Sequence, residues 1–241
     1  MAKINPRSYV LASGKHSWRI CPIGYHWVNK HPRKEDKDTI VLVKGHCRKN
    51  PNNKDILEID EIQEISSVFT SMLKREDLPS SQNLGFGEDG RKYDELIGLW
   101  TKYWNDIFNP EEKLSPNIVK ALMATESGFQ PMPKNAPKGH KAIGIMQLMP
   151  ETVKYLSSAK ELKNFHIDLI QKEAWDPTVN IASAVRWLFR KREIGEHRLK
   201  KKLTWMEVLE EYKGITGDTS PVAVKIRNSL KTYYTKLLGN K

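Results

Sequence analysis

Three helix-start signals between residues 115 and 221 constrain the fold more than any other feature of this sequence. In each, a residue that can cap a helix directly precedes a proline: Ser115-Pro116, Asp176-Pro177 and Ser220-Pro221. The capping oxygen accepts a hydrogen bond from a backbone N–H of the first turn, and proline at the first helical position has no N–H to leave unpaired. Thr204 and Glu207 add a fourth signal, a capping box. We therefore expect helices to begin at these four places, and we interpret Asp176 as a helix cap, not as a catalytic acid.

Apolar residues at helical spacing follow these signals, so the predicted helices have one face to bury. Further helices are expected at residues 93–108, at 150–156 and at 55–74, where apolar residues recur with the same spacing. The segment between Phe129 and Ala142 is rich in Pro, Lys and Gly, cannot be helical throughout, and is expected to border a cleft. The sequence thus predicts a mainly α fold, a helical bundle around a cleft.

Glu126 is the first candidate for a chemical role. Val119, Leu122, Met123 and Glu126 lie on one face of the helix that starts after Ser115, and Gly128 is a stop signal just beyond them. The face is otherwise apolar, so the carboxyl group is expected to be half-buried. Burial raises the pKa of a carboxyl group and keeps it protonated near neutral pH, ready to act as a general acid. The alternative is an ordinary helix-terminal Glu, solvated or paired with a Lys.

Three ordered blocks carry a resemblance to a known family. They are Glu126-Ser127-Gly128-Phe129, the run Gly144-Ile-Met-Gln-Leu-Met-Pro150, and Asp176-Pro177 with Asn180-Ile181. Together they resemble the lytic transglycosylases with an SLT catalytic domain, which are related in fold to goose-type lysozyme. The resemblance runs from about residue 93 to about residue 234 and implies a lysozyme-like helical catalytic domain.

A fourth block departs from the family pattern. Where the family usually reads Ala-Tyr-Asn-Ala-Gly, this chain reads Glu211-Tyr212-Lys213-Gly214, which keeps the Tyr and loses the Asn. Periodicity supports Tyr212 independently, because it ends an apolar stripe that begins at Trp205. A buried Tyr hydroxyl needs a hydrogen-bond partner. The resemblance implies that this partner is the catalytic carboxylate, and the alternative is a core Tyr bonded to a carbonyl.

The resemblance also implies the chemistry and the site. Glu126 would protonate the oxygen between N-acetylmuramic acid and N-acetylglucosamine, while the acetamido oxygen of the substrate stabilises the developing cation, without a second carboxylate. Glu126 would then act as a base and close a 1,6-anhydro ring; if water enters instead, the same site is a muramidase. Ser127, Met146, Gln147 and Tyr212 would bind the substrate, although Met146 can equally be core packing. Neither a metal nor another cofactor is expected.

The N-terminal region is predicted to be a separate, β-containing module. Val28-x-x-His31-x-Arg-Lys recurs fifteen residues later as Val43-x-x-His46-x-Arg-Lys, in a stretch rich in Val, Ile, Tyr and Trp. Two copies suggest two equivalent strands or a hairpin, with residues 30–38 as the connecting loop. We expect the domains to span residues 1–54 (binding module), 55–92 (connecting helix and linker, flexible from residue 78 on) and 93–241 (catalytic domain).

Both cysteines, Cys21 and Cys47, belong to this module. Cys and His residues are zinc ligands, and His26, His31 and His46 lie close by in the sequence. The spacing matches no standard zinc finger. Free thiols, or a disulfide acquired after export, are therefore favoured over zinc.

The net charge of +11 suits an anionic polymer as partner. Peptidoglycan and other wall polymers are anionic and fit this charge. Nucleic acid is less expected, because the densest basic run, residues 190–202, has no interleaved aromatic residues. We interpret this run as a solvated helix face. We expect no membrane span and no signal peptide, hence action on the cell wall after phage-type, effector-type or lytic release. The N-terminal module would bind a wall polymer or delivery machinery. The competing hypothesis is a non-catalytic basic protein that binds wall or nucleic acid.

Overall fold

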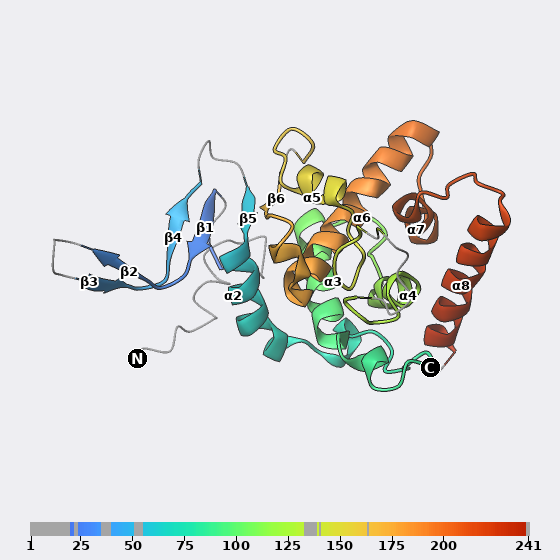
Figure 1. The fold of residues 1–241 in the computed structure, drawn as a ribbon, viewed down its shortest axis with the longest axis horizontal. Coiled ribbons are helices and arrows are strands. Elements are labelled where there is room, and N and C mark those ends of the chain that lie inside the picture. Colours follow the sequence, from blue (N-terminus) through green and yellow to red (C-terminus); the bar gives the residue numbers. More distant parts are fainter. Residues whose placement is uncertain are drawn as a thin grey trace.

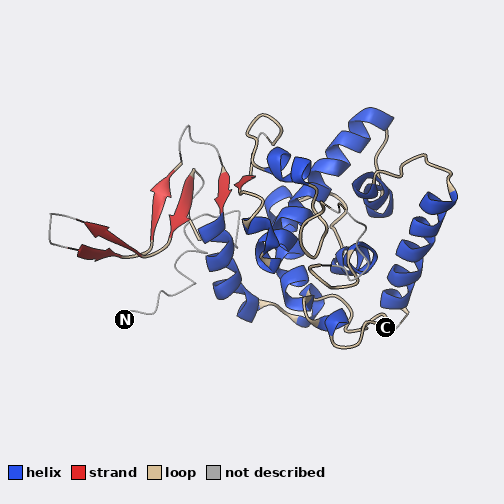
Figure 2. Cartoon of the chain, viewed as in Figure 1, coloured by secondary structure: helices blue, strands red, loops and turns tan. Residues whose placement is uncertain are grey.

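A computed structural model describes residues 20–21, 24–34, 40–50, 55–132, 139, 141–162 and 164–239 of the chain. Strands gather at one end of the molecule and helices at the other (Figure 2). The mainly α prediction is confirmed. Among the described helices, none combines the length and the apolar composition needed to cross a membrane.

The four helices that follow a start signal, α4, α6, α7 and α8, begin where that signal predicts. The described helices are α2 Ile59–Phe69, α3 Asp94–Phe108, α4 Pro116–Glu126, α5 Pro150–Leu156, α6 Pro177–Leu199, α7 Trp205–Lys213 and α8 Pro221–Leu238. The caps are formed as expected: Ser115, Asp176 and Ser220 each accept a hydrogen bond from a backbone N–H of the first turn, and Thr204 with Glu207 closes a capping box. Asp176 is therefore a helix cap.

The core of the helical body lies around α3 and α6, which cross near its centre (Figure 1). Trp100 and Trp104 on α3 are fully buried, and the Trp104 indole donates a hydrogen bond of 2.9 Å to the carbonyl of Ala182 on α6. Helix α4 packs against α3, α7 and α8. Since α4 ends at Glu126, this packing fixes the position of the candidate acid.

The N-terminal strands form one long antiparallel hairpin. Strand β1 (Tyr25–Val28) pairs with β4 (His46–Lys49), and β2 (His31–Lys34) pairs with β3 (Ile40–Val43) in the same continuous register. Both copies of the repeated motif end in a strand, β2 and β4, so the expected hairpin is formed. The loop predicted over residues 30–38 is wrong in part, because residues 31–34 belong to β2; residues 35–39 lie outside the described part of the chain. We call β1–β4 the hairpin arm.

The segment after the arm joins it to the helical body. Residues 55–74 do not form the single predicted helix: strand β5 (Ile56–Glu58) comes first, and α2 then runs from residue 59 to 69. Strand β5 pairs in parallel with β6 (His166–Asp168), a strand between α5 and α6. This pairing requires an edge more than a hundred residues away in the chain, which helical periodicity cannot reveal.

Residues 78–91, predicted to be a flexible linker, pack against the body. The backbone N–H of Ser80 donates to Asn117 Oδ1 at 2.7 Å, and the Ser80 carbonyl accepts from Lys120 Nζ at 2.8 Å. Phe86 meets Phe129 edge to face. Fixed contacts with α4 and the segment after it therefore replace the flexibility that the Gly- and Ser-rich composition predicted. Short 3₁₀ helices flank or interrupt this region: Thr70–Met72, Arg75–Asp77 and Asp89–Arg91, and a fourth, Glu173–Trp175, precedes α6.

The two cysteines form a disulfide between Cys21 and Cys47, 26 residues apart. The bond ties the segment before β1 to β4, at the base of the arm. Of the alternatives left open by the spacing, the structure has the disulfide.

Candidate active site

Glu126 is the last residue of α4, and its side chain is 9% exposed. The chain turns sharply after it, because Gly128 and Phe129 both adopt positive φ values of 59° and 65°. A Cβ atom at Gly128 would lie 2.9 Å from Phe86, so glycine is needed there for space as well as for conformation. Burial raises the pKa of the Glu126 carboxyl group above its ordinary value. The acid on the apolar helix face was expected to be half-buried, and it is buried more deeply than that.

Lys213 neutralises this carboxyl group. Its Nζ lies 2.8 Å from Glu126 Oε2, and the Lys213 side chain is 16% exposed. The ammonium group lowers the pKa of Glu126, so it partly opposes the effect of burial. Burial and pairing with a lysine, the two alternatives expected for Glu126, occur together in the structure. The sequence indicates a role for Lys213 only through its position, since it stands where the family block has Asn.

A tight loop lies beside this pair. Ile143 and Leu148 form an isolated antiparallel bridge, and the chain reverses between them through Gly144 and Gln147, whose φ values are +71° and +51°. The Gln147 side chain donates from Nε2 to the Gly144 carbonyl at 2.7 Å and is 9% exposed. The loop therefore fixes Gln147 by its own backbone.

The side chain of Asn180, near the start of α6, anchors the loop by three hydrogen bonds. Its Oδ1 accepts the backbone N–H of Met146 at 2.7 Å, and its Nδ2 donates to the carbonyls of Ile143 at 3.0 Å and Ala174 at 2.8 Å. A Cβ atom at Gly144 would come within 2.4 Å of Asn180 Nδ2, which explains the glycine. Sequence reasoning treated Asn180 only as part of a helix start. The family block marks Asn180 in the sequence. Its role could not be predicted, because it depends on a contact with Met146, 34 residues earlier in the chain.

Ser127 ties the end of α4 to the same loop. Its hydroxyl donates to the Ile145 carbonyl at 2.7 Å and is also 3.4 Å from the Met123 carbonyl. Ser127 was expected to bind the substrate. In the structure its hydroxyl holds the loop next to Glu126.

Tyr212 bonds the loop from the other side. Its hydroxyl donates to the Met146 carbonyl at 2.8 Å, so the carboxylate partner implied by the family resemblance is wrong for this structure, and the carbonyl alternative is the observed one. Burial, and to a lesser degree the nearby charge of Glu126, raise the pKa of Tyr212 well above its ordinary value. The phenol is therefore neutral, and the Met146 side chain is fully buried. Three of the predicted site residues, Tyr212, Met146 and Gln147, thus meet at one loop beside Glu126.

The basic run at residues 190–202 belongs to the outer part of α6 and the turn after it. Most of its cations pair with carboxylates of the protein: Arg190 with Glu161 and Glu193, Arg192 with Glu112 and Glu196, Arg198 with Glu211, Lys201 with Glu207, and Lys202 with Glu196. This partly exposed, ion-paired surface agrees with the expectation of a solvated helix face.

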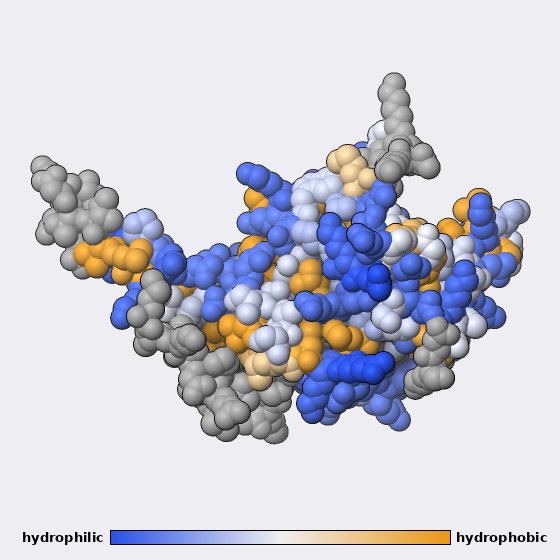
Figure 3. Space-filling view, turned by 90° about the horizontal axis from the view of Figure 1, so that it is seen from below, coloured by the Kyte–Doolittle hydropathy of each residue, from blue (hydrophilic) through white to orange (hydrophobic). Residues whose placement is uncertain are grey.

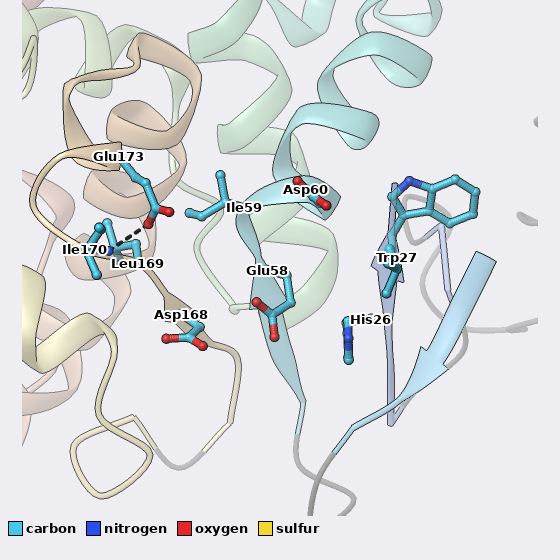
Figure 4. A pocket seen from close by; sticks show the side chains of 10 residues that line it. His26, Trp27, Glu58, Ile59, Asp60, Asp168, Leu169, Ile170 and Glu173 are labelled. Atoms are coloured by element: carbon cyan, nitrogen blue, oxygen red, sulfur yellow. Dashed lines mark hydrogen bonds between the residues drawn. The ribbon is translucent and has the colours of Figure 1, made fainter. Parts of the chain in front are cut away.

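A hollow of about 410 Å³ lies where the hairpin arm meets the helical body (Figure 4). It is lined by His26 of the arm and by the carboxylates of Glu58, Asp60, Asp168 and Glu173. Burial, and then the charge of Asp168, raise the pKa of Glu58. None of the predicted site residues lines this hollow, and among the described residues no group of His, Cys, Asp and Glu has the arrangement to hold a metal ion.

Comparison with protein families gives one match. Residues 106–220 match the family model described as the transglycosylase SLT domain. The matched segment contains Glu126, the Gly144 loop, Asn180, Tyr212 and Lys213. Searches of curated proteins and of solved structures found no match.

Proposed function

Since residues 106–220 form a transglycosylase SLT domain, a domain of peptidoglycan-cleaving enzymes, we propose that this protein cuts the β-1,4 bond between N-acetylmuramic acid and N-acetylglucosamine and releases a 1,6-anhydro product. The observation that carries the proposal is the buried carboxyl group of Glu126 at the end of α4. Among the described residues, Lys213 is the charged group that acts on it, and no second carboxylate does. Substrate-assisted glycoside cleavage needs one carboxyl group, whereas the usual mechanisms need two.

In the first step, the Glu126 carboxyl group gives its proton to the oxygen that links the two sugars. The bond from C1 of N-acetylmuramic acid to this oxygen breaks, and the acetamido oxygen of the same sugar bonds to C1. Burial supports this step, because it raises the pKa of Glu126 and favours the protonated form.

In the second step, Glu126 is a carboxylate and acts as the base. It removes the proton of the C6 hydroxyl group, the C6 oxygen bonds to C1, and the bond from C1 to the acetamido oxygen breaks. Glu126 is protonated again at the end of the cycle. No water is consumed, so the product is one water lighter than a hydrolysis product.

The predicted substrate-binding residues act through the loop in this proposal. Gln147 and the backbone near Met146 hold the sugar, while the hydroxyls of Ser127 and Tyr212 keep the loop in place by bonds to two successive carbonyl groups, those of Ile145 and Met146. Groups held this rigidly orient a substrate at little entropic cost.

The test is a digestion of purified peptidoglycan, with mass spectrometry of the fragments. The wild type should release anhydro fragments, and Glu126→Gln should release none, because an amide cannot donate the proton and return as a base. Glu95→Gln, which removes an exposed carboxylate from α3, is the control and should behave like the wild type. Hydrated fragments would instead identify a muramidase, and an intact wall with both wild type and control would support the non-catalytic alternative.

For the hairpin arm we propose binding to an anionic wall polymer. Residues 25–50 contain seven Lys or Arg residues and three carboxylate side chains, and the carboxylates all fall between residues 35 and 38. Strands β2 and β3 extend furthest from the helical body (Figure 1), and β3 exposes Val41 and Leu42 by 37% and 64%. An apolar patch is visible toward the outer end of the arm (Figure 3). Basic and apolar surface together suit a polymer with phosphate or carboxylate groups on a carbon backbone.

Sedimentation with purified cell walls tests this role in the Glu126→Gln background, where the wall stays intact. The double variant Arg33→Glu with Arg48→Glu should lower the bound fraction and lose the salt dependence of binding. The control is Lys225→Glu with Lys231→Glu on α8, which changes the net charge equally on the opposite side of the molecule. Equal losses for the two double variants would mean that the overall charge, and not the arm, binds the wall.

A further inference from the structure

Lys213 has no role in the proposed mechanism, although it contacts the catalytic carboxyl group. It directly follows Tyr212 at the end of α7, and Gly214, with φ +66°, ends the helix. Because the Tyr212 hydroxyl is fixed to the Met146 carbonyl, the last turn of α7 is anchored next to the catalytic loop. This anchoring directs Lys213 onto Glu126, 87 residues earlier in the chain.

The contact is a charged one in a nearly closed environment. The two side chains are 16% and 9% exposed, and the atoms are 2.8 Å apart. A hydrogen bond between charged groups is stronger than a neutral one and is screened little by solvent when buried. An Asn at this position, as in the family block, would offer a donor without a charge.

The other groups around this pair do not compensate the ammonium charge. Tyr212 is neutral and bonded to a carbonyl. Glu211, two residues before Lys213 on α7, pairs with Arg198, and the loop from Ile143 to Met149 has no ionisable side chain. Arg227 on α8, a helix packed against α4, pairs with Glu210. Among the described residues, Lys213 is the charged group that shifts the pKa of Glu126.

We propose that Lys213 is a positioning residue for the catalytic carboxyl group: its ammonium group holds Oε2, leaves Oε1 to face the glycosidic oxygen, and restricts the use of Glu126 as an acid to a lower pH range than an uncharged residue would. The inference rests on the proposed function and concerns the same site. With Lys213 at this position, the carboxylate form of Glu126 is favoured more strongly, and the protonated form that the first step needs is favoured less, than with Asn.

The charge of Lys213 affects the two steps differently, because Glu126 loses a proton in the first step and regains one in the second. The first step leaves a carboxylate at Glu126, and the ammonium group stabilises this product of proton donation. The second step starts from the same carboxylate, which Lys213 keeps ionised and oriented until the C6 hydroxyl is deprotonated. Lys213 takes no part in the proton transfer in this proposal, because Glu126 both gives and regains the proton. In the resting enzyme, however, the same charge favours the carboxylate, which cannot start the first step.

The direct test does not depend on activity. With ¹³C-labelled glutamate, the Glu126 carboxyl signal is assigned by its loss in Glu126→Gln, and its titration is followed by NMR in the full-length protein. In Lys213→Asn and Lys213→Met the midpoint should move upward by about one pH unit or more, the effect of removing an opposite charge at this distance. Lys213→Arg should keep the wild-type midpoint. Lys201→Met, which removes a lysine paired with Glu207 at the other end of α7, is the control and should also keep it.

The same variants are then compared in peptidoglycan cleavage across pH. The alkaline limb of kcat/KM should move upward with the NMR midpoint in Lys213→Asn and Lys213→Met, while Lys213→Arg restores the wild-type limb. The change should appear in kcat and not in KM, since Lys213 contacts the acid and not the sugar. An unchanged Glu126 titration in correctly folded Lys213→Met overturns the inference. A wild type that titrates as expected but leaves peptidoglycan intact overturns the proposed function only.

Discussion

Replacing Asn180 with Ala should separate the stability of the site from that of the fold as a whole. Asn180 is fully buried and satisfies three backbone groups at once, the N–H of Met146 and the carbonyls of Ile143 and Ala174. Two of these groups belong to the loop that carries Gln147. The substitution therefore leaves buried polar groups without partners and frees the loop from α6.

The magnitude follows from these contacts. Each buried polar group that loses its partner costs about 1 to 3 kcal/mol. Three such groups should lower the free energy of unfolding by about 3 kcal/mol at the least, which corresponds to a fall in Tm of about 6 °C or more for a chain of this size. A displacement of the loop by about 1 Å would also lower kcat/KM by about 100-fold.

The assay is urea unfolding followed by circular dichroism, together with peptidoglycan cleavage. Ser183→Ala, one turn further along α6, is the matched control: Ser183 is equally buried, but its hydroxyl finds no hydrogen-bond partner among the described residues. Removing it should leave stability and activity unchanged or slightly improved. If Asn180→Ala and Ser183→Ala cost the same, hydrogen bonding by Asn180 does not hold the loop, and the reasoning fails.

Three further outcomes are expected. Lys120→Met leaves Asp94 without its buried partner and should lower the free energy of urea unfolding by about 2 to 4 kcal/mol. Burial raises the pKa of Asp94 to about 6, so the carboxyl group keeps its proton at pH 5 and the loss should be larger at pH 8. A loss that does not depend on pH would contradict this. Tyr212→Phe should lower kcat/KM by about 10-fold through one lost hydrogen bond of about 1.4 kcal/mol, and an unchanged rate would exclude a role for the hydroxyl. Cys47→Ser, which opens the bond to Cys21, should speed hydrogen exchange in β1 and β4 but not in α6, and equal effects in both regions would show that the arm does not unfold separately.

Helix positions could be predicted because their causes are local. The oxygens of Ser115, Asp176 and Ser220 reach N–H groups two or three residues further on, and the apolar stripes repeat within a single helix. Glu126 was predicted to be buried for the same reason, as the last member of such a stripe. The strand β5 was missed because its partner, β6, is far away in sequence. The packing of residues 78–91 was missed because their composition is that of a linker.

Local sequence is enough to place Glu126 at the end of α4 and Tyr212 and Lys213 at the end of α7, since helical register depends on neighbouring residues. The partners of these side chains depend on how the helices pack. Tyr212 bonds the Met146 carbonyl 66 residues away, and Lys213 bonds Glu126 87 residues away. These contacts depend on the angle at which α4 and α7 pack and on the loop held by Asn180, which involve the whole core. The physical reason is therefore one of range: capping and periodicity act over one or two helical turns, whereas the charge balance at Glu126 depends on segments that only folding brings together.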